Sequence, residues 1–461
     1  MAGRQQKNQY ELAFMAAGSG EAATLASEGT EPAVAERSAE SPTQNERLME
    51  EVCEAENLRQ ALKRVRSNKG SPGLDGMSVD ELPGHLKEHW PSLRTELLQG
   101  TYKPQPVKRV EIEKPDGGTR KLGIPTVLDR FIQQAVLQVL QPRWEGTFSD
   151  YSYGFRPGRS AHQAVAQAQR YIAEGYTVVV DIDLEKFFDR VNHDILMSRI
   201  ARRVTDQRAL KLMRAFLNAG VMEHGLVSPT DEGAPQGGPL SPWMSNVLLD
   251  ELDKELESRG HRFCRYADDC NIYVRSERAG ERVMASISQY LRGQLKLRVN
   301  EEKSAVGRPR ERKFLGFSFT GGVQPRRRIA PKALLRLKER IRELTRRSRG
   351  IRLEQMVAEV AEYLRGWIGY FGYCETPTVL RDLDAWIRRK LRCVQWKQWK
   401  VMRKRYAELR KQGIGHELAI STAGSSYGPW RLSRSLAMSM ALSNTYFARL
   451  GLPKLEARRS V

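Results

Sequence analysis

Two adjacent carboxylates, Asp268 and Asp269, stand between two short apolar stretches of the chain. The flanking residues 261–266 and 270–274 are rich in aromatic and β-branched side chains, which is typical of two strands joined by a tight turn. Carboxylates that project from such a turn can share a divalent cation, because Mg²⁺ prefers oxygen ligands. An isolated Asp-Asp pair is more often a solvated turn, so a metal site requires a third carboxylate from a separate strand.

A third carboxylate occurs upstream, at the end of a second predicted strand. The β-branched residues 177–180 lead into Asp181 and Asp183, which alternate onto one face of that strand. If the strand lies beside the hairpin, Asp183 converges with Asp268 and Asp269, and such a cluster is costly unless cations about 3.5–4 Å apart neutralise it. The pattern therefore predicts phosphoryl transfer with two Mg²⁺ ions, for which Mn²⁺ can substitute. Whether Asp181 contributes to the metal site stays open.

These residues resemble the bacterial group II intron reverse transcriptases, a family whose members also act as maturases. The Tyr-Ala-Asp-Asp sequence at residues 266–269 is the family hallmark, and counting back from Phe188 and Asp189 places its other metal-binding aspartate on Asp183. The resemblance implies RNA-directed DNA synthesis, in which one ion lowers the pKa of an attacking 3′-hydroxyl and the other binds the triphosphate. The predicted catalytic and metal-binding residues are therefore Asp183, Asp268 and Asp269.

Other blocks of the family follow in its order and place side chains near an incoming nucleotide. Residues 114–125 look like the fingers hairpin, whose cations meet the triphosphate, and residues 234–242 look like the loop beside the nascent base pair. Residues 295–304 resemble the block that places a lysine near the leaving pyrophosphate, so Lys303 is a candidate general acid. In isolation these blocks would be turns and a solvated lysine. The resemblance predicts nucleotide-binding roles for Lys114, Arg120, Leu184, Phe188 and Gln236.

Phe188 follows Asp183 at the spacing where the family carries a bulky side chain that crowds the sugar 2′ position. The resemblance therefore predicts a preference for dNTPs over ribonucleotides. The alternative interpretation is that Phe187 and Phe188 both belong to the hydrophobic core.

Basic residues gather in the last third of the chain. Residues 326–461 contain 31 basic and 11 acidic side chains, whereas residues 1–56 contain 4 and 11. A basic surface binds phosphates independently of sequence, through counterion release. Residues 151–162 interleave aromatics with arginines, which suits base stacking, although a Gly-Pro loop before a helix can be purely architectural. The candidate nucleic-acid-binding residues are Arg156, Arg159, Arg365, Arg388, Arg389 and Lys397.

The expected fold is α+β, a right-hand polymerase with fingers, a palm built on an antiparallel sheet, and an α-helical thumb, followed by a basic helical C-terminal domain. A cationic helix is expected over residues 379–411. The predicted boundaries are a flexible N-terminal extension over 1–45, fingers and palm over 46–322, a thumb or maturase X domain over 328–376, and a nucleic-acid-binding domain over 377–461.

The expected partners are group II intron RNA, an RNA template with a DNA or RNA primer, target DNA and dNTPs, for a monomer or homodimer. Five dispersed cysteines without a Cys-x-x-Cys pair argue against the zinc-stabilised HNH nuclease of many relatives. They also indicate a reduced cytoplasmic protein, and no apolar stretch has transmembrane length. Two alternatives remain: a non-enzymatic splicing cofactor, disfavoured by the three aspartates, and a domesticated reverse transcriptase in defence or repair.

Overall fold

The computed structural model describes residues 47–113, 119–223, 226–228, 232–234 and 237–456. The chain forms two compact units. The first comprises Met1–Ala164 and Val180–Val306, and the second comprises Val165–Val179 and Gly307–Val461. Within the described ranges, no helix combines the length and apolar character needed to span a membrane. All five cysteines are buried and none forms a disulfide.

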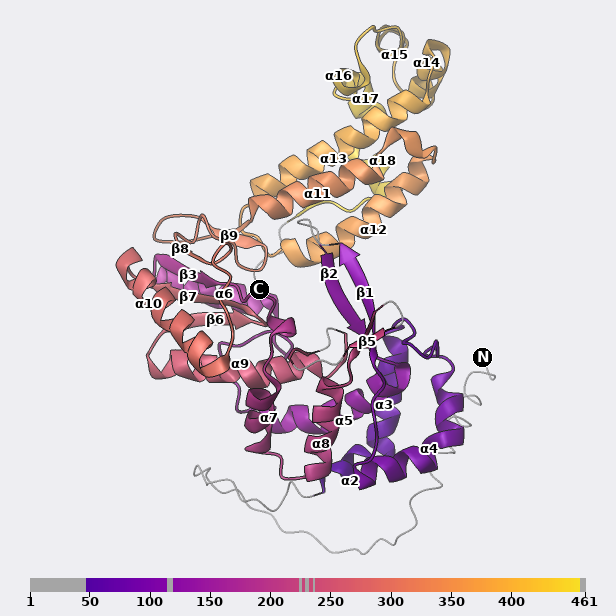
Figure 1. Cartoon of the computed structure of the whole chain (residues 1–461). Helices are drawn as coiled ribbons and strands as arrows, with labels where there is room; N and C mark the ends of the chain where they lie inside the picture. Colours follow the sequence, from indigo (N-terminus) through magenta and orange to yellow (C-terminus); the bar gives the residue numbers. More distant parts are fainter. Residues whose placement is uncertain (1–46, 114–118, 224–225, 229–231, 235–236, 457–461) are drawn as a thin grey trace, which may run out of the picture. The chain divides into compact units, whose positions relative to one another are not determined.

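A four-stranded sheet corresponds to the predicted palm (Figure 1). Its strand order is β6-β7-β3-β8, so the strand that precedes Asp183 neighbours the hairpin that carries Asp268 and Asp269, as predicted. Strands β6 and β7 are antiparallel, with Tyr266 opposite Asp269 across a two-residue turn. Helix α9 packs against β6 and helix α10 against β7. The bounds are β3 Val178–Ile182, β6 Arg262–Tyr266, β7 Asp269–Val274, β8 Ala305–Gly307, α9 Ser241–Ser258 and α10 Glu277–Tyr290.

A second sheet of the first unit has the order β2-β1-β4-β5. Strand β1 pairs antiparallel with β2 and parallel with β4. The strand bounds are β1 Val107–Glu113, β2 Thr119–Ile124, β4 Val221–Glu223 and β5 Leu226–Ser228. This sheet contains the predicted fingers hairpin.

The helices of the first unit pack on one another, and the amphipathic helix α3 packs its apolar face along α5. Thr126 caps α5, because its side chain accepts a hydrogen bond from the backbone N–H of Asp129. The helices are α2 Leu48–Val52, α3 Ala55–Ser67, α4 Leu82–Gln99, α5 Val127–Glu145, α7 His193–Ala201 and α8 Gln207–Leu217. Helix α6, Ala161–Ala173, and the 3₁₀ turn η2, Phe187–Asp189, flank β3 in sequence.

The second unit is mainly helical. An antiparallel strand pair, β9 Phe317–Phe319 and β10 Arg327–Ile329, precedes α11. Helix α11 packs on α12, and α12 packs on α13. The helix bounds are α11 Pro331–Leu344, α12 Leu353–Phe371, α13 Pro377–Gln398, α14 Met402–Lys411, α15 His416–Ala423, α16 Pro429–Leu432, α17 Leu436–Ala441 and α18 Asn444–Arg449.

The prediction of one continuous helix over residues 379–411 was wrong at one point. The helix ends at Gln398 and a new one begins at Met402. Between them Lys400 takes a left-handed backbone conformation, with φ of 42°. That conformation cannot continue an α-helix, so the basic segment is divided into two shorter helices.

Candidate active site

The three predicted carboxylates follow from neighbouring strands. Asp183 is the first residue after β3, Asp268 lies in the β6-β7 turn, and Asp269 begins β7. Asp181, inside β3, has its Oδ1 3.0 Å from the side-chain nitrogen of Asn271 on β7 once that amide is oriented to donate. Among the described residues, no three carboxylate, imidazole or thiol groups are gathered closely enough to hold an ion. The structure thus confirms the adjacency of the strands and leaves the metal ligands as a prediction.

Asp183 is held by the loop that carries Lys303. The backbone N–H of Asp183 donates to Ser304 Oγ at 2.9 Å, and its carbonyl accepts from the backbone N–H of Asn300 at 2.8 Å. Lys303 Nζ lies 3.6 Å from Asp183 Oδ1, and the two side chains are 63% and 32% exposed. The predicted general acid and a predicted metal ligand are therefore brought together on an accessible surface.

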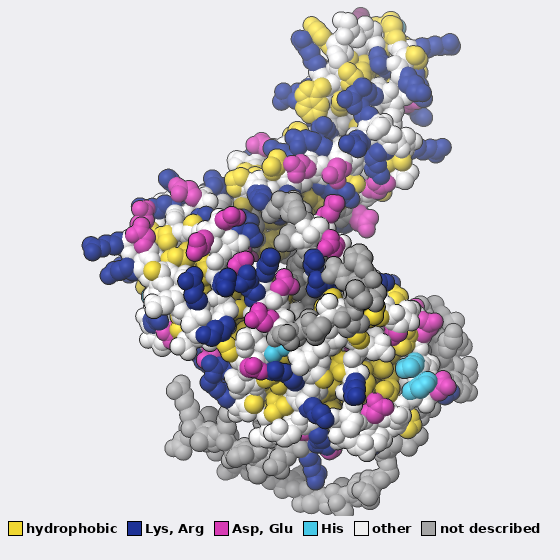
Figure 2. All heavy atoms as spheres, viewed as in Figure 1, with side chains coloured by type: hydrophobic (Ala, Val, Ile, Leu, Met, Phe, Trp, Pro, Cys, Tyr) yellow, Lys and Arg dark blue, Asp and Glu magenta, His cyan; other side chains and the backbone are white. Residues whose placement is uncertain are grey.

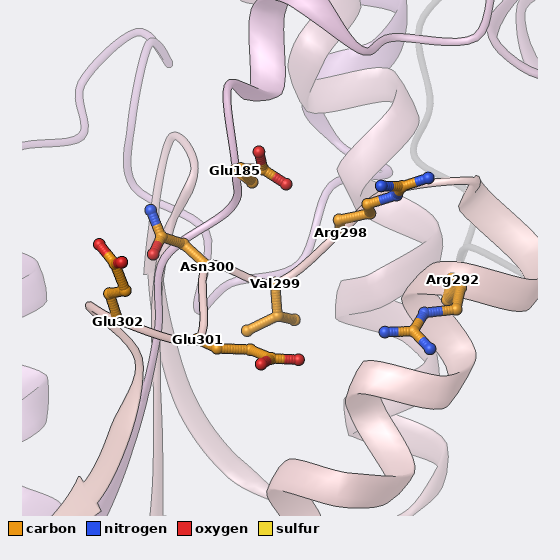
Figure 3. A pocket seen from close by; sticks show the side chains of 7 residues that line it. All are labelled: Glu185, Arg292, Arg298, Val299, Asn300, Glu301 and Glu302. Carbon is orange, nitrogen blue, oxygen red and sulfur yellow. The ribbon is translucent and has the colours of Figure 1, made fainter.

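A cavity of about 700 Å³ lies beside this loop (Figure 3). Negatively charged glutamates and positively charged arginines both line it, so the lining does not favour ligands of one charge. It contains none of the predicted ligands. The lining residues are Glu185, Arg292, Arg298, Val299, Asn300, Glu301 and Glu302.

Phe188 lines a separate cavity of about 350 Å³ between the fingers strands and the turn after β3. Phe187, whose ring centroid is 5.2 Å from that of Phe188, is only 3% exposed. One phenyl ring therefore belongs to the core and the other faces a cavity. Three cationic residues that the sequence reasoning did not select line the same cavity: Arg109, Lys121 and Lys186.

The strand pairing provides a signal that could have selected two of these cations. Arg109 lies opposite Gly123, and Lys121 lies opposite Glu111, so both sit on paired positions of the fingers hairpin. Positions two residues apart in a strand share a face. Arg109 is paired with Gly123, and Lys121 lies two residues from Gly123, so both cations lie on one face of the hairpin. Recognising this shared face would have made both of them candidates for nucleotide binding.

Of the remaining predicted nucleotide-binding residues, one is buried and three lie wholly or partly outside the described residues. Leu184 is 5% exposed and pairs with Val299, so its side chain lies in the core. Lys114 and Gln236 lie outside the described residues, as does the side chain of Arg120. Their nucleotide contacts stay predictions.

Two predicted nucleic-acid-binding arginines are structural, which corrects the sequence-based assignment. Arg156 is 8% exposed and donates to Glu145 Oε1 at 2.8 Å and to the carbonyl of Ser152 at 2.8 Å. Arg388 is 4% exposed and forms an ion pair with Asp384 one helical turn earlier. Guanidinium groups buried in this way are not available to a phosphate.

The other four cationic candidates remain at least partly exposed. Arg159 pairs with Asp150 at 2.7 Å, and Arg389 lies 3.7 Å from the centroid of the Trp430 ring. Arg365 and Lys397 are exposed. Figure 2 shows lysines and arginines distributed over the helices of the second unit, interspersed with apolar side chains.

Two family descriptions match the chain. "Reverse transcriptase (RNA-dependent DNA polymerase)" matches residues 112–319, and "Group II intron, maturase-specific domain" matches residues 334–413. The first match begins near the end of β1 and extends through β9, and the second begins within α11 and extends through α14. The chain therefore joins a polymerase region to a maturase region.

Relatives agree with these matches. The chain is 34% identical over 316 residues to Protein YkfC of Escherichia coli K12, a match that covers 60% of this chain and 82% of YkfC. It is 38% identical over 195 residues to the group II intron-encoded protein LtrA of Lactococcus lactis subsp. cremoris, covering 42% of this chain and 32% of LtrA. A solved structure, the partial Cas6-RT-Cas1–Cas2 complex, aligns with 54% of this chain and 43% of its own chain. The TM-score of this alignment is 0.35 and the sequence identity is 23%.

The chain has the fold of a right-hand polymerase followed by a helical domain. It belongs to the family of group II intron reverse transcriptases and maturases.

Proposed function

We propose that the protein copies RNA into DNA at the β3 and β6-β7 carboxylates, and that its basic helical region binds group II intron RNA to promote splicing and mobility by target-primed reverse transcription. The observation that carries this proposal is the placement of Lys303 beside Asp183, which directly follows a strand that neighbours the Tyr-Ala-Asp-Asp hairpin. In this proposal the fingers and palm occupy residues 46–322, the thumb 328–376 and the nucleic-acid-binding domain 377–461.

The donor set suits a hard divalent cation, because Asp183, Asp268 and Asp269 offer only carboxylate oxygens and none of them is buried. These three residues would hold two Mg²⁺ ions, with Mn²⁺ as a substitute. Bound there, the ions would lower the pKa of the primer 3′-hydroxyl and stabilise charge on the leaving pyrophosphate. Asp181 is already engaged by Asn271, so we assign it a supporting role for the strand and not a role as ligand.

The chain's own side chains divide the remaining tasks. Lys303 holds a proton on Nζ close to the site where the pyrophosphate leaves, and gives it to the leaving oxygen. Arg109, Lys121 and Lys186 offer positive charge to the triphosphate in the cavity that Phe188 lines. Phe188 excludes a 2′-hydroxyl from that cavity by its bulk.

Primer extension on an RNA template with dNTPs and Mg²⁺ tests the proposal, with wild type compared with the double variant Asp268→Ala/Asp269→Ala. Splicing of the cognate intron is measured in parallel. We expect cDNA from wild type alone and splicing with both proteins. If both proteins promote splicing and neither makes cDNA, the protein is a non-enzymatic splicing cofactor and not a polymerase. If the double variant loses splicing, the two activities are not separable.

A further inference from the structure

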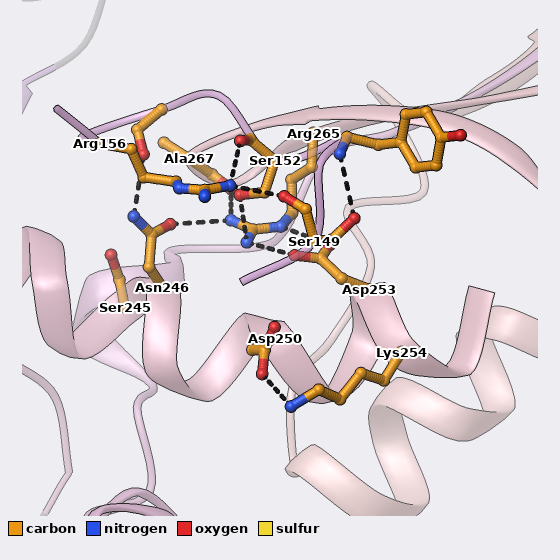
Figure 4. A network of polar contacts seen from close by, with 12 residues as sticks. Ser149, Ser152, Arg156, Ser245, Asn246, Asp250, Asp253, Lys254, Arg265 and Ala267 are labelled. Atoms are coloured by element: carbon orange, nitrogen blue, oxygen red, sulfur yellow. Dashed lines mark hydrogen bonds and ion pairs between the residues drawn. The ribbon is translucent and has the colours of Figure 1, made fainter. Parts of the chain in front are cut away.

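The guanidinium group of Arg265 lies in a buried polar network beside the catalytic hairpin (Figure 4). Arg265 belongs to β6 and is 0% exposed. A guanidinium has five N–H donors, and each donor of Arg265 has an acceptor 2.6–3.0 Å away. The acceptors are Asp253 Oδ1, Asp253 Oδ2, Asn246 Oδ1, Ser152 Oγ and the carbonyl oxygen of Ala267.

One of these hydrogen bonds ends on the hairpin turn itself. Arg265 Nη1 donates to the carbonyl oxygen of Ala267 at 2.9 Å. Ala267 has a φ of 57°, a left-handed conformation that residues with a Cβ rarely adopt. Such a conformation persists only where its surroundings hold it. The bond from Arg265 therefore supports the backbone immediately before Asp268.

The backbone of Arg265 fixes the same turn against the loop that follows α5. Its N–H donates to the carbonyl of Tyr151 at 2.9 Å, and its carbonyl accepts from the N–H of Tyr153 at 2.9 Å. The next loop residue, Gly154, leaves no room between loop and turn, because a Cβ there would lie 2.3 Å from the backbone nitrogen of Ala267. Residues 151–154 of this loop therefore fit closely against the hairpin, and we call them the seat.

Helix α9 holds both parts of this arrangement. Asp253 binds the guanidinium through both of its oxygens, while Asn246 Nδ2 donates to the carbonyl of Gly154 at 2.8 Å. Arg156 also binds the seat, because its Nη1 donates to the carbonyl of Ser152 at 2.8 Å. Burial raises the pKa of the Asp253 carboxyl. Burial alone would lower the pKa of Arg265, but the adjacent Asp253 carboxylate raises it, so the guanidinium stays charged.

A buried ion pair by itself says little about function, since an apolar pair of similar volume can stabilise a core as well. The network of Arg265 differs because it joins α9, the seat and the turn through one rigid side chain. A lysine, with three donors on a flexible stem, could not reproduce these contacts.

We propose that Arg265 is a positioning residue, which sets the Ala267-Asp268 turn on the seat formed by residues 151–154 and thereby places Asp268 and Asp269 for metal binding. This inference rests on the proposed function of the two aspartates. It goes further by making the metal geometry depend on a side chain that contacts neither metal nor substrate.

Two variants test the proposal from opposite sides of the contact. Arg265→Lys removes donors from the network, and Gly154→Ala leaves Arg265 intact but pushes the seat against the turn. Gly146→Ala is the matched control, because no atom lies within 4 Å of a Cβ at that position and its φ of −72° is unstrained. Each full-length protein is compared for thermal unfolding, template-primer binding, Mn²⁺ binding by electron paramagnetic resonance, and single-nucleotide kcat and KM.

We expect Gly154→Ala to lower kcat by about 10- to 100-fold and to weaken Mn²⁺ binding. The added Cβ should also lower the unfolding temperature relative to Gly146→Ala, because it overpacks the contact with the turn, whereas KM and template-primer affinity of the folded protein stay near those of Gly146→Ala. Arg265→Lys should act in the same direction. If Arg265→Lys does not fold, Gly154→Ala decides together with Ser152→Ala, which deletes one acceptor and should reduce kcat by about three- to tenfold.

Wild-type Mn²⁺ affinity and kcat in a folded Gly154→Ala protein would overturn the proposal. If wild type makes no cDNA, the proposed polymerase function fails on its own. The positioning inference then stands if Mn²⁺ binding is lost in Asp268→Ala/Asp269→Ala and weakened in Gly154→Ala, and is overturned if Gly154→Ala binds Mn²⁺ as wild type does.

Discussion

The ammonium group of Lys303 lies 3.6 Å from Oδ1 of Asp183, although 120 residues of sequence separate the two. The loop over residues 300–304 creates this proximity, because Asn300 and Ser304 both bind the backbone of Asp183. A local hydrogen-bonded loop thus brings a proton donor to the end of β3.

Replacing Lys303 by methionine should slow nucleotide addition by about 100-fold, the usual range for loss of a general acid. The side chain keeps its length but loses its proton and charge. The measurement is single-turnover incorporation of one dNTP as a function of pH. Lys313→Met, at an exposed position in the same region of the sequence, is the control, and equal rates for both variants would contradict the assigned role.

Phe188→Ala should reduce the preference for dNTPs over ribonucleotides by about tenfold or more, because it removes the bulk that lines the cavity. The check is the ratio of kcat/KM for a matched dNTP and rNTP pair. Phe187→Ala is an informative comparison. Since that ring is buried, we expect it to lower the free energy of unfolding by about 3–5 kcal/mol and to leave the selectivity of the folded fraction unchanged.

Arg208 joins α2 to α8 through hydrogen bonds to Glu50 at 2.7 Å and to Asp206 at 2.9 Å. The hydrogen bond from Arg208 lowers the pKa of Glu50. Burial acts to raise the pKa of Asp206, but hydrogen bonds from Arg208 and from the Met49 N–H outweigh it and lower that pKa too. Both carboxyls therefore have folded-state pKa values below their unfolded ones.

Groups with lowered pKa values stabilise the fold at pH values above their unfolded pKa, about 4 for Asp and Glu, and lose that contribution as the pH falls through the folded value. As the pH falls from about 5 to about 3, we expect the free energy of unfolding of wild type to decrease more steeply than that of Arg208→Met. Urea unfolding at each pH measures this. Lys211→Met, an exposed change on the same helix, should keep the wild-type slope, and parallel curves for all three proteins would refute the assignment.

The strands and the turn at the site could be predicted from sequence because their signals are local. A β-branched stretch precedes Asp183, and a two-residue turn separates apolar stretches around Asp268. The network around Arg265 could not be predicted in this way. Its acceptors Ser152 and Asp253 come from separate segments, and nothing in the sequence around an arginine tells whether distant carboxylates will enclose it.

The same limitation explains the two arginines that were assigned to nucleic acid and proved structural. Arg156 and Arg388 occur in cationic, aromatic stretches that match a binding surface in composition, and only packing shows that their guanidinium groups face inward. The break at Lys400 was also invisible, because neither glycine nor proline marks it. Composition located the basic region correctly but could not separate exposed from buried charges.

Exposed and buried cations of the second unit should therefore respond differently to substitution. Arg365→Ala and Lys397→Ala should each weaken intron RNA binding and reduce the slope of log affinity against log salt by about one, as expected for loss of a phosphate contact. Arg388→Met should leave that slope unchanged and lower the free energy of unfolding by about 1–3 kcal/mol, because it removes the ion-pair partner of the Asp384 carboxylate, which keeps only the hydrogen bond from the Leu455 N–H among the contacts described. Filter binding at several salt concentrations and urea unfolding on the same preparations measure both effects. A reduced salt slope for Arg388→Met, with unchanged stability, would reverse the structural assignment of that residue.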